Sequence, residues 1–120
     1  MGTFKHNIIV VHGERDRVYD LWRLASTLFN SPGDGYFLVT PMIVTMNAIA
    51  SFMVGPDGSK EESSDSDEYD KFREEFKRTI DLLGFPDGSN MAYYTEIVTI
   101  DDQSSEGPRI ISTNIKKGGA

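Results

Sequence analysis

The sequence has 120 residues, of which 38% are hydrophobic and 26% are charged. A chain of this size fits one globular domain that buries roughly two thirds of the surface of its unfolded state. Nineteen acidic and twelve basic residues give a formal net charge of -7, which repels nucleic-acid backbones and favours a basic protein partner. The chain has no cysteine, so disulfides, thiolate metal ligands and cysteine nucleophiles are excluded.

The N-terminal residues MGTFKHNIIVVHG lack the ordered basic, apolar and small-residue regions of a signal peptide. We therefore expect a cytoplasmic protein. Residues 36–55 carry no charge over a length that could span a membrane as a helix. Polar residues and a proline interrupt this stretch, and no basic residue flanks its N-terminal side directly. We expect no membrane segment.

The first two predicted elements are a strand and a helix. Residues 5–11 form a short β-branched run in which Ile8–Val11 leaves no polar face, so we predict a strand that is at least partly covered on both faces. From Glu14 to Asn30, apolar residues recur at steps of three and four, which is typical of an amphipathic helix. The following sequence NSPGDG ends that helix.

Residues 40–55 fit two templates. Alternation of apolar and polar residues over 44–54 predicts a pair of strands bent near residues 45–48. The same stretch could be a helix capped by Thr40 and terminated by Gly55. We favour strands because β-branched and aromatic residues are frequent there; the helix remains an open alternative.

The second predicted helix runs from Ser66 to Leu83, with Asp65 or Ser66 as its cap. Two strand-like runs follow, at residues 93–100 and 109–115, and a polar loop joins them into a hairpin.

This order of elements predicts an α+β fold: an antiparallel sheet of four to five strands with two helices on one face. It matches the ferredoxin-like (split βαβ) plan with an extra C-terminal strand. We expect a single domain over residues 1–115 and a flexible C-terminal tail over residues 116–120. The plan serves enzymes, RNA binders and regulatory modules alike, so it fixes no activity.

The most unusual feature is an acidic stretch after residue 56, which can attract an arginine-rich or lysine-rich cleft. The predicted partner-binding patch consists of Asp57, Glu61, Glu62, Asp65, Asp67, Glu68 and Asp70. A protein that mimics duplex DNA would need a longer array of negative charges. Here the acidic stretch is followed by four cations, Lys71, Arg73, Lys77 and Arg78. We therefore predict a local docking patch for a protein with a basic surface.

The sequence has few groups of residues that could form a catalytic or metal-binding site. The acids of DSDEYD do not match the spacing of an EF-hand calcium loop, and helix capping explains them more simply. We expect no metal, no cofactor and no catalytic residue. The alternative is a small-molecule or nucleotide pocket, or a small enzyme, built around His12, Glu14 and Arg15, where a glycine separates a strand from a helix.

The run FMVGPDGSKE, the acid-rich helix after it and the later DGSNMAYYTEIV together cover about half the chain. In these segments the chain resembles short uncharacterised accessory proteins of phages and mobile elements that contain a strand, a PDGSKE turn and a helix. The resemblance carries no catalytic residues. It implies a small accessory protein that binds a host enzyme or defence factor, in the host cytoplasm if the protein is phage-encoded.

The sequence therefore predicts an acidic, non-catalytic protein-binding module. A phage-encoded inhibitor of a host or defence protein is the most specific form of this prediction. A ligand-binding protein and a structural or assembly subunit are the alternatives, and a homodimer is compatible with all three. Direct binding to nucleic acid or membrane is not expected.

Overall fold

The computed structural model describes residues 4–30, 38–59, 63–82, 92–101 and 107–115. Its elements in chain order are β1 (Phe4–Glu14), α1 (Arg15–Phe29), β2 (Ile43–Val44), a 3-10 turn (Met46–Ala48), β3 (Ile49–Val54), α2 (Ser64–Leu82), β4 (Ala92–Asp101) and β5 (Arg109–Thr113). The strands form one antiparallel sheet in the order β2-β3-β1-β4-β5. The predicted tail, residues 116–120, lies outside the described residues.

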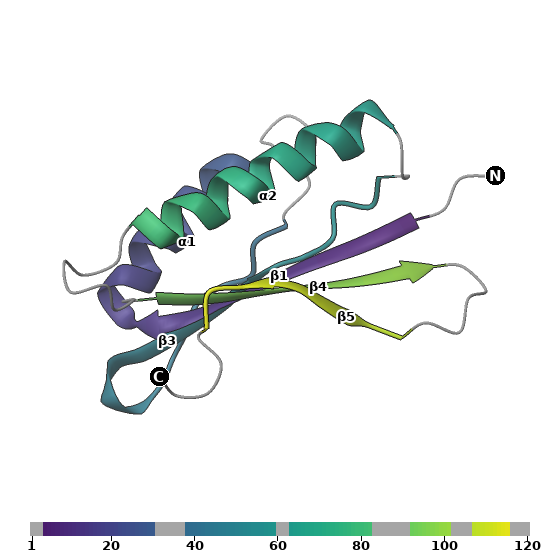
Figure 1. Cartoon of the computed structure of the whole chain (residues 1–120). Helices are drawn as coiled ribbons and strands as arrows, with labels where there is room; N and C mark the ends of the chain where they lie inside the picture. The colour runs from purple at the N-terminus through teal and green to yellow at the C-terminus, as the bar shows by residue number, and fades with distance from the viewer. Residues whose placement is uncertain (1–3, 31–37, 60–62, 83–91, 102–106, 116–120) are drawn as a thin grey trace.

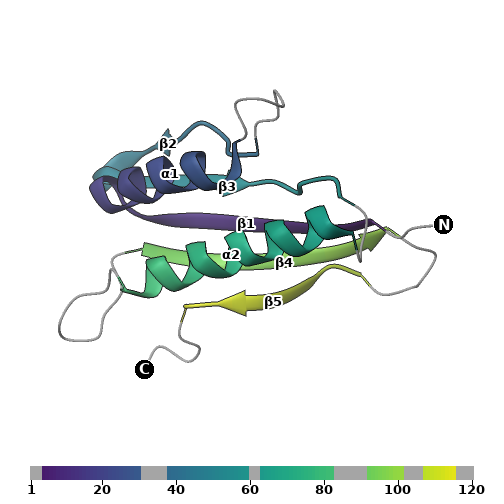
Figure 2. The ribbon, with the colours of Figure 1, turned by 90° about the horizontal axis from the view of Figure 1, so that it is seen from above.

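The molecule has two layers, with α1 and α2 on the same face of the sheet (Figure 1). Seen from above, α1 lies over the β3 side of the sheet and α2 over the β4 side (Figure 2). The predicted α+β class, with two helices on one face and an added C-terminal strand at the sheet edge, is confirmed. The ferredoxin-like assignment stays a prediction.

The central strand β1 pairs with β3 on one side and with β4 on the other. Its odd-numbered residues point to the helices, and Ile9 and Val11 there are fully buried. Ile8 and Val10, on the opposite face, are only half-buried. The apolar run of this strand is thus completely covered on one face and partly covered on the other.

Helix α1 follows β1 directly and agrees with its predicted range. Glu14 caps it, because its carboxylate accepts hydrogen bonds from the backbone N–H groups of Asp16 and Arg17 at 3.1 Å each. At the other end, Asn30 Oδ1 accepts from the N–H of Leu38 at 2.8 Å, which ties the chain after the helix back to its end.

Residues 43–44 and 49–54 are strands joined by the 3-10 turn, so the helix interpretation of residues 40–55 is wrong. The bend lies where it was predicted, because Asn47 and Ala48 adopt left-handed backbone angles with φ of 62° and 56°. The N–H of Thr45 donates to the carbonyl of Ile49 at 2.8 Å and closes this turn. Alternate burial along β3 then directs Phe52 and Val54 into the core.

Helix α2 begins two residues before its predicted start. The cap is Ser63 rather than Asp65 or Ser66, because Ser63 Oγ accepts from the N–H of Ser66 at 3.1 Å. The aromatic rings of Phe76 and Phe29 meet edge to face, with centroids 5.8 Å apart, and join the two helices over the sheet. Among the described residues, no helix has the length and apolar character that crossing a bilayer requires.

Candidate functional site

Helix α2 presents charged side chains in two directions. Its acids, all wholly or partly exposed, are Asp65, Asp67, Glu68, Asp70, Glu74, Glu75 and Asp81. Two of its cations, Lys71 and Arg78, are also exposed, but Arg73 and Lys77 point inward and are only 3% and 6% exposed. The helix therefore has an acidic outer surface and a cationic inner edge.

Arg73 is the centre of the inner charges. Its Nη1 lies 2.7 Å from Oδ2 of Asp57, and its Nη2 contacts Oδ1 of Asp70. Its Nε lies 3.8 Å from Oε2 of Glu96. Because Asp57 follows β3 and Glu96 lies in β4, this guanidinium group connects α2 to two parts of the sheet.

Lys77 lies one helical turn further along the same edge. Its Nζ is 2.6 Å from Oε1 of Glu96 and 2.7 Å from Oε1 of Glu74. Glu96 is 2% exposed, and its other oxygen accepts from Nδ2 of Asn7 at 2.8 Å. The buried carboxylate thus has a charged or polar partner at each oxygen, as a buried charge requires.

The pKa values of Asp57 and Lys77 indicate that these two groups remain charged. Burial alone would raise the pKa of Asp57, but hydrogen bonds from Ser59 and Arg73 outweigh it and hold the pKa below the ordinary value of 3.8. Burial alone would lower the pKa of Lys77, but its hydrogen bonds to Glu74 and Glu96 outweigh it and raise the pKa above 10.5. Asp57 and Lys77 are therefore charged at neutral pH.

The predicted acidic patch divides into parts with different environments. Asp57 does not lie on the surface: its side chain is 4% exposed and is paired to Arg73. Glu61 and Glu62 lie outside the described residues. Asp65, Asp67 and Glu68 are exposed in the first turns of α2, and Asp70 is half-buried beside Arg73. The structure therefore brings the last four together on one helix.

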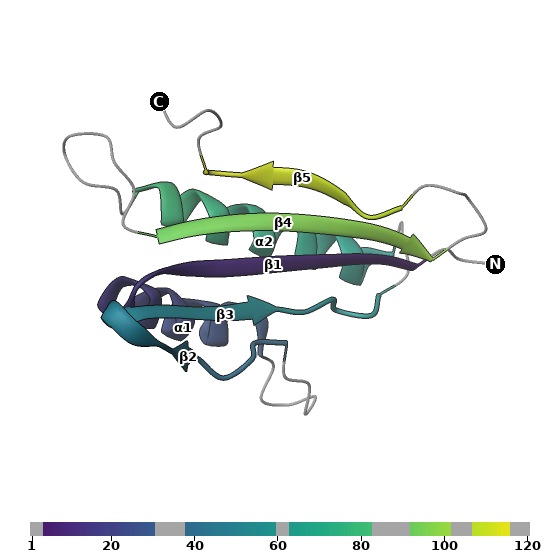
Figure 3. The ribbon, with the colours of Figure 1, turned by 90° about the horizontal axis from the view of Figure 1, so that it is seen from below.

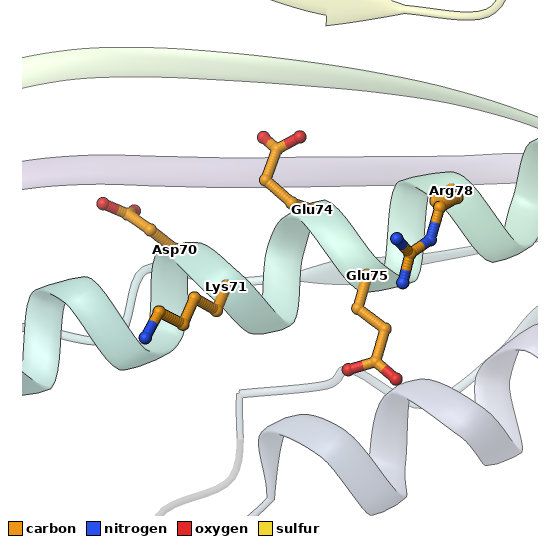
Figure 4. Close-up of a pocket in the computed structure, with 5 residues that line it drawn as sticks. All are labelled: Asp70, Lys71, Glu74, Glu75 and Arg78. Atoms are coloured by element: carbon orange, nitrogen blue, oxygen red, sulfur yellow. The ribbon is translucent and has the colours of Figure 1, made fainter.

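A shallow depression continues this surface along α2, lined by Asp70, Lys71, Glu74, Glu75 and Arg78. Figure 4 shows Asp70 and Glu74 projecting to one side of the helix and Lys71 and Glu75 to the other. Every lining residue comes from this one helix, and both signs of charge are present. Such a surface suits contacts with charged side chains of another molecule.

The residues of the alternative pocket, His12, Glu14 and Arg15, each have contacts of their own. His12 lies on the sheet face away from the helices, where its ring is 5.4 Å from that of Tyr93. Glu14 uses both carboxylate oxygens to cap α1, and Arg15 is exposed with its Nε 3.3 Å from Asp16. The three side chains thus have separate partners within the chain, and the pocket around them stays a prediction.

In the part of the chain that the structure describes, no three His, Asp or Glu side chains gather in a group that could hold a metal ion. The acids at the start of α2 include Asp67 in its first turn, where carboxylates stabilise the helix dipole. Capping and dipole effects therefore account for part of this acidity, as the sequence indicated.

Sequence reasoning missed the buried roles of Arg73 and Lys77 and their partner Glu96. A signal was present in the alternation of β4, where Glu96 occupies an inward position between the buried residues Tyr94 and Val98. An acid at such a position needs a buried cation. The four-residue spacing of Arg73 and Lys77 on α2 supplies two on one edge.

Comparisons of the chain with protein-family models, with curated proteins and with solved structures found no match.

Proposed function

We propose that this chain is a non-catalytic protein-binding module that docks on a basic surface of its partner through the outer surface of α2. The contact residues are Asp65, Asp67 and Glu68, with Asp70, Glu74 and Glu75 extending the surface along the helix. Carboxylates arranged in this way attract and orient a partner that presents Arg and Lys side chains.

The observation that carries this proposal is the inward direction of Arg73 and Lys77. In the sequence, four cations on α2 lie among its acids. Two of them are instead buried, where they pair with Glu96 and Asp57 inside the molecule and with Asp70 and Glu74 at the edge of the helix. The outer surface of α2 is consequently more acidic than the sequence indicates, which favours a basic partner.

The kind of partner follows from the resemblance to accessory proteins of phages and mobile elements. We propose that the module inhibits a host or defence protein by occupying a basic cleft that normally takes an acidic ligand. The competition would be steric and electrostatic, so it needs no catalytic residue in this chain.

A capture experiment tests the acidic surface. The immobilised chain is incubated with bacterial lysate at 50 mM and at 500 mM NaCl, and the retained proteins are quantified by mass spectrometry. Salt screens exposed charges, so proteins that bind through α2 should be retained at low salt and lost at high salt. The double variant Asp67→Asn with Glu68→Gln should lose the same proteins.

The matched control is Asp16→Asn with Asp20→Asn, which removes the same charge from the exposed side of α1. Both pairs lie near the start of a helix, so their effects on helix stability are comparable. The control should retain the partner proteins. Equal retention by the wild type and the α2 variant, with no effect of salt, would contradict the proposal.

A further inference from the structure

The sheet has one face that no described helix covers. Seen from below, β1, β3, β4 and β5 lie in front of both helices (Figure 3). The strand registers place Val10 beside Met53, and Ile8 beside Ile97, which in turn is beside Ile110. These five residues form a contiguous apolar surface, which we call the open face.

The central part of the open face has no acidic side chain, although the chain has a net charge of -7. Side chains alternate between the two faces of a sheet. This part of the open face therefore contains the even-numbered residues of β1 in the range 6–12. It also contains the odd-numbered residues of β3 in the range 51–53 and of β4 in the range 93–99. None of these positions holds Asp, Glu, Lys or Arg. A basic or acidic partner would find no complementary charge here, whereas a second copy of the chain would meet an equally neutral surface.

The area of the open face is near the lower limit for a stable dimer. The five strands contain 34 residues. At strand rise and spacing each residue occupies about 16 Å² of the sheet, which gives roughly 550 Å² in plan. Stable interfaces bury at least about 600 Å² on each partner, so the open face comes close to the lower end of that range.

The sequence of β1 supports the same conclusion. An unbroken apolar run such as Ile8–Val11 is typical of a strand that is covered on both faces. Within one chain the helices cover only the face of Ile9 and Val11. A second sheet packed about 10 Å away would cover Ile8 and Val10 as well.

We propose that the protein forms a homodimer in which the open faces of two copies pack against each other. The two helical layers then lie on the outside, with the α2 surfaces of the two copies pointing in opposite directions. The approach of two acidic chains is least repulsive through this neutral face. A dimer of this kind presents the outer surface of α2 twice, which would raise its avidity for a partner with repeated sites.

The first test measures mass by sedimentation equilibrium. The monomer mass is 13.4 kDa, and the wild type should sediment with twice that mass at tens of micromolar. Ile110→Lys places a charge on the open face at a residue that is 66% exposed, so the fold should tolerate it. We expect the dissociation constant to rise at least tenfold, because each copy would then bury or displace a lysine.

The control is Leu82→Lys, which changes an exposed apolar residue on α2 and should leave the dissociation constant unchanged. Thermal unfolding by circular dichroism shows whether each variant is folded. A wild type that remains monomeric at several hundred micromolar would overturn the proposal, whatever else binds the open face. An equal effect of both variants would also overturn it.

The second test locates the interface. The chain lacks cysteine, so a single introduced cysteine can be spin-labelled without background. Labels at Thr95→Cys, on the open face, should give much shorter distances between copies than labels at Thr27→Cys on α1. Shorter distances between the α1 labels would show that the copies meet through their helices and would overturn the proposal.

Discussion

The two helices pack on the sheet by partly different physical means. Under α1 the contacts are apolar: Val18, Leu21 and Ala25 are buried against β1 and β3. Helix α2 also buries Phe76 and Ile80. Over β4, however, it is held in addition by ion pairs of Arg73 and Lys77 with Glu96. The comparison shows that an amphipathic helix can direct charges inward, provided that the sheet supplies a partner of opposite sign.

The difference has a functional consequence. On α1 the inward face is apolar, and the charges of both signs remain in solvent. On α2 two cations are removed from solvent, which leaves an outer surface dominated by carboxylates. The ionic anchor under α2 thus removes two cations from a helix surface on which acids already outnumber cations.

Removing the shared carboxylate should have the largest effect on stability. Glu96→Ala leaves Lys77 without its buried partner, and breaking a buried pair from one side costs about 3–5 kcal/mol of the free energy of unfolding. Urea denaturation measures this change. Glu75→Ala, on the exposed side of α2, is the control and should change stability by less than about 0.5 kcal/mol. A loss under 1 kcal/mol for Glu96→Ala would contradict the ionic anchor.

A cavity under α1 should cost slightly less and should not depend on charge. Leu21→Ala removes a fully buried side chain and should lower the free energy of unfolding by about 2–5 kcal/mol. The same loss is expected at pH 4.5 and at pH 7, since no ionisable group takes part in this contact. If the stability loss of Leu21→Ala depended strongly on pH, the packing of α1 would not be purely apolar, and the contrast with α2 would be wrong.

Acidification should affect the anchor of α2 selectively. The pKa of Asp57 is below its ordinary value of 3.8, so its stabilising effect is complete above that value and is lost as pH falls through the lowered pKa. Asp57→Asn should cost about 1.5–3 kcal/mol at pH 7, because it weakens a charge-assisted hydrogen bond to Arg73.

The pH profile of that variant provides its own control. Thermal unfolding between pH 7 and pH 2 should show a shallower decline for Asp57→Asn than for the wild type. Parallel declines would mean that Asp57 does not contribute to acid unfolding. At the opposite end, the pKa of Lys77 is raised above 10.5, so its contribution is present below that value and is lost as pH rises through the raised pKa.

The smallest effect is expected at the exposed partner of the same lysine. Glu74 lies 2.7 Å from Lys77, but its side chain is 75% exposed. Exposed ion pairs contribute about 0–1 kcal/mol, so Glu74→Gln should change the free energy of unfolding by no more than about 0.5 kcal/mol in urea denaturation. A loss as large as that of Glu96→Ala would show that solvent does not weaken the ion pair between Glu74 and Lys77.

Much of the fold could be predicted from the sequence because its periodicities are clear. The three- and four-residue spacing of α1 and the two-residue alternation of β3 both predicted the observed elements. The start of α2 was misplaced, since several neighbouring residues could cap it and only the backbone selects Ser63.

The candidate site was less predictable, because the sequence gives the charge of a side chain but not whether that side chain points into solvent or into the molecule. Asp57 appeared to belong to the acidic patch, yet its carboxylate is buried beside Arg73. That pairing joins residues sixteen apart in the chain, and only the packing of α2 on the sheet brings them together. The open face of the sheet could not be predicted either, because the apolar run of β1 does not show which of its two faces the helices cover.

The most direct test of the central claim is the chemical accessibility of two lysines on the same helix. Lys77 is buried with a raised pKa, whereas Lys71 is exposed. Pulse acetylation of the native protein, read by peptide mass spectrometry, should modify Lys71 at least ten times faster than Lys77, since Lys77 reacts only after local opening. Equal rates would place Lys77 in solvent and would contradict both the ionic anchor and the removal of this cation from the outer surface of α2.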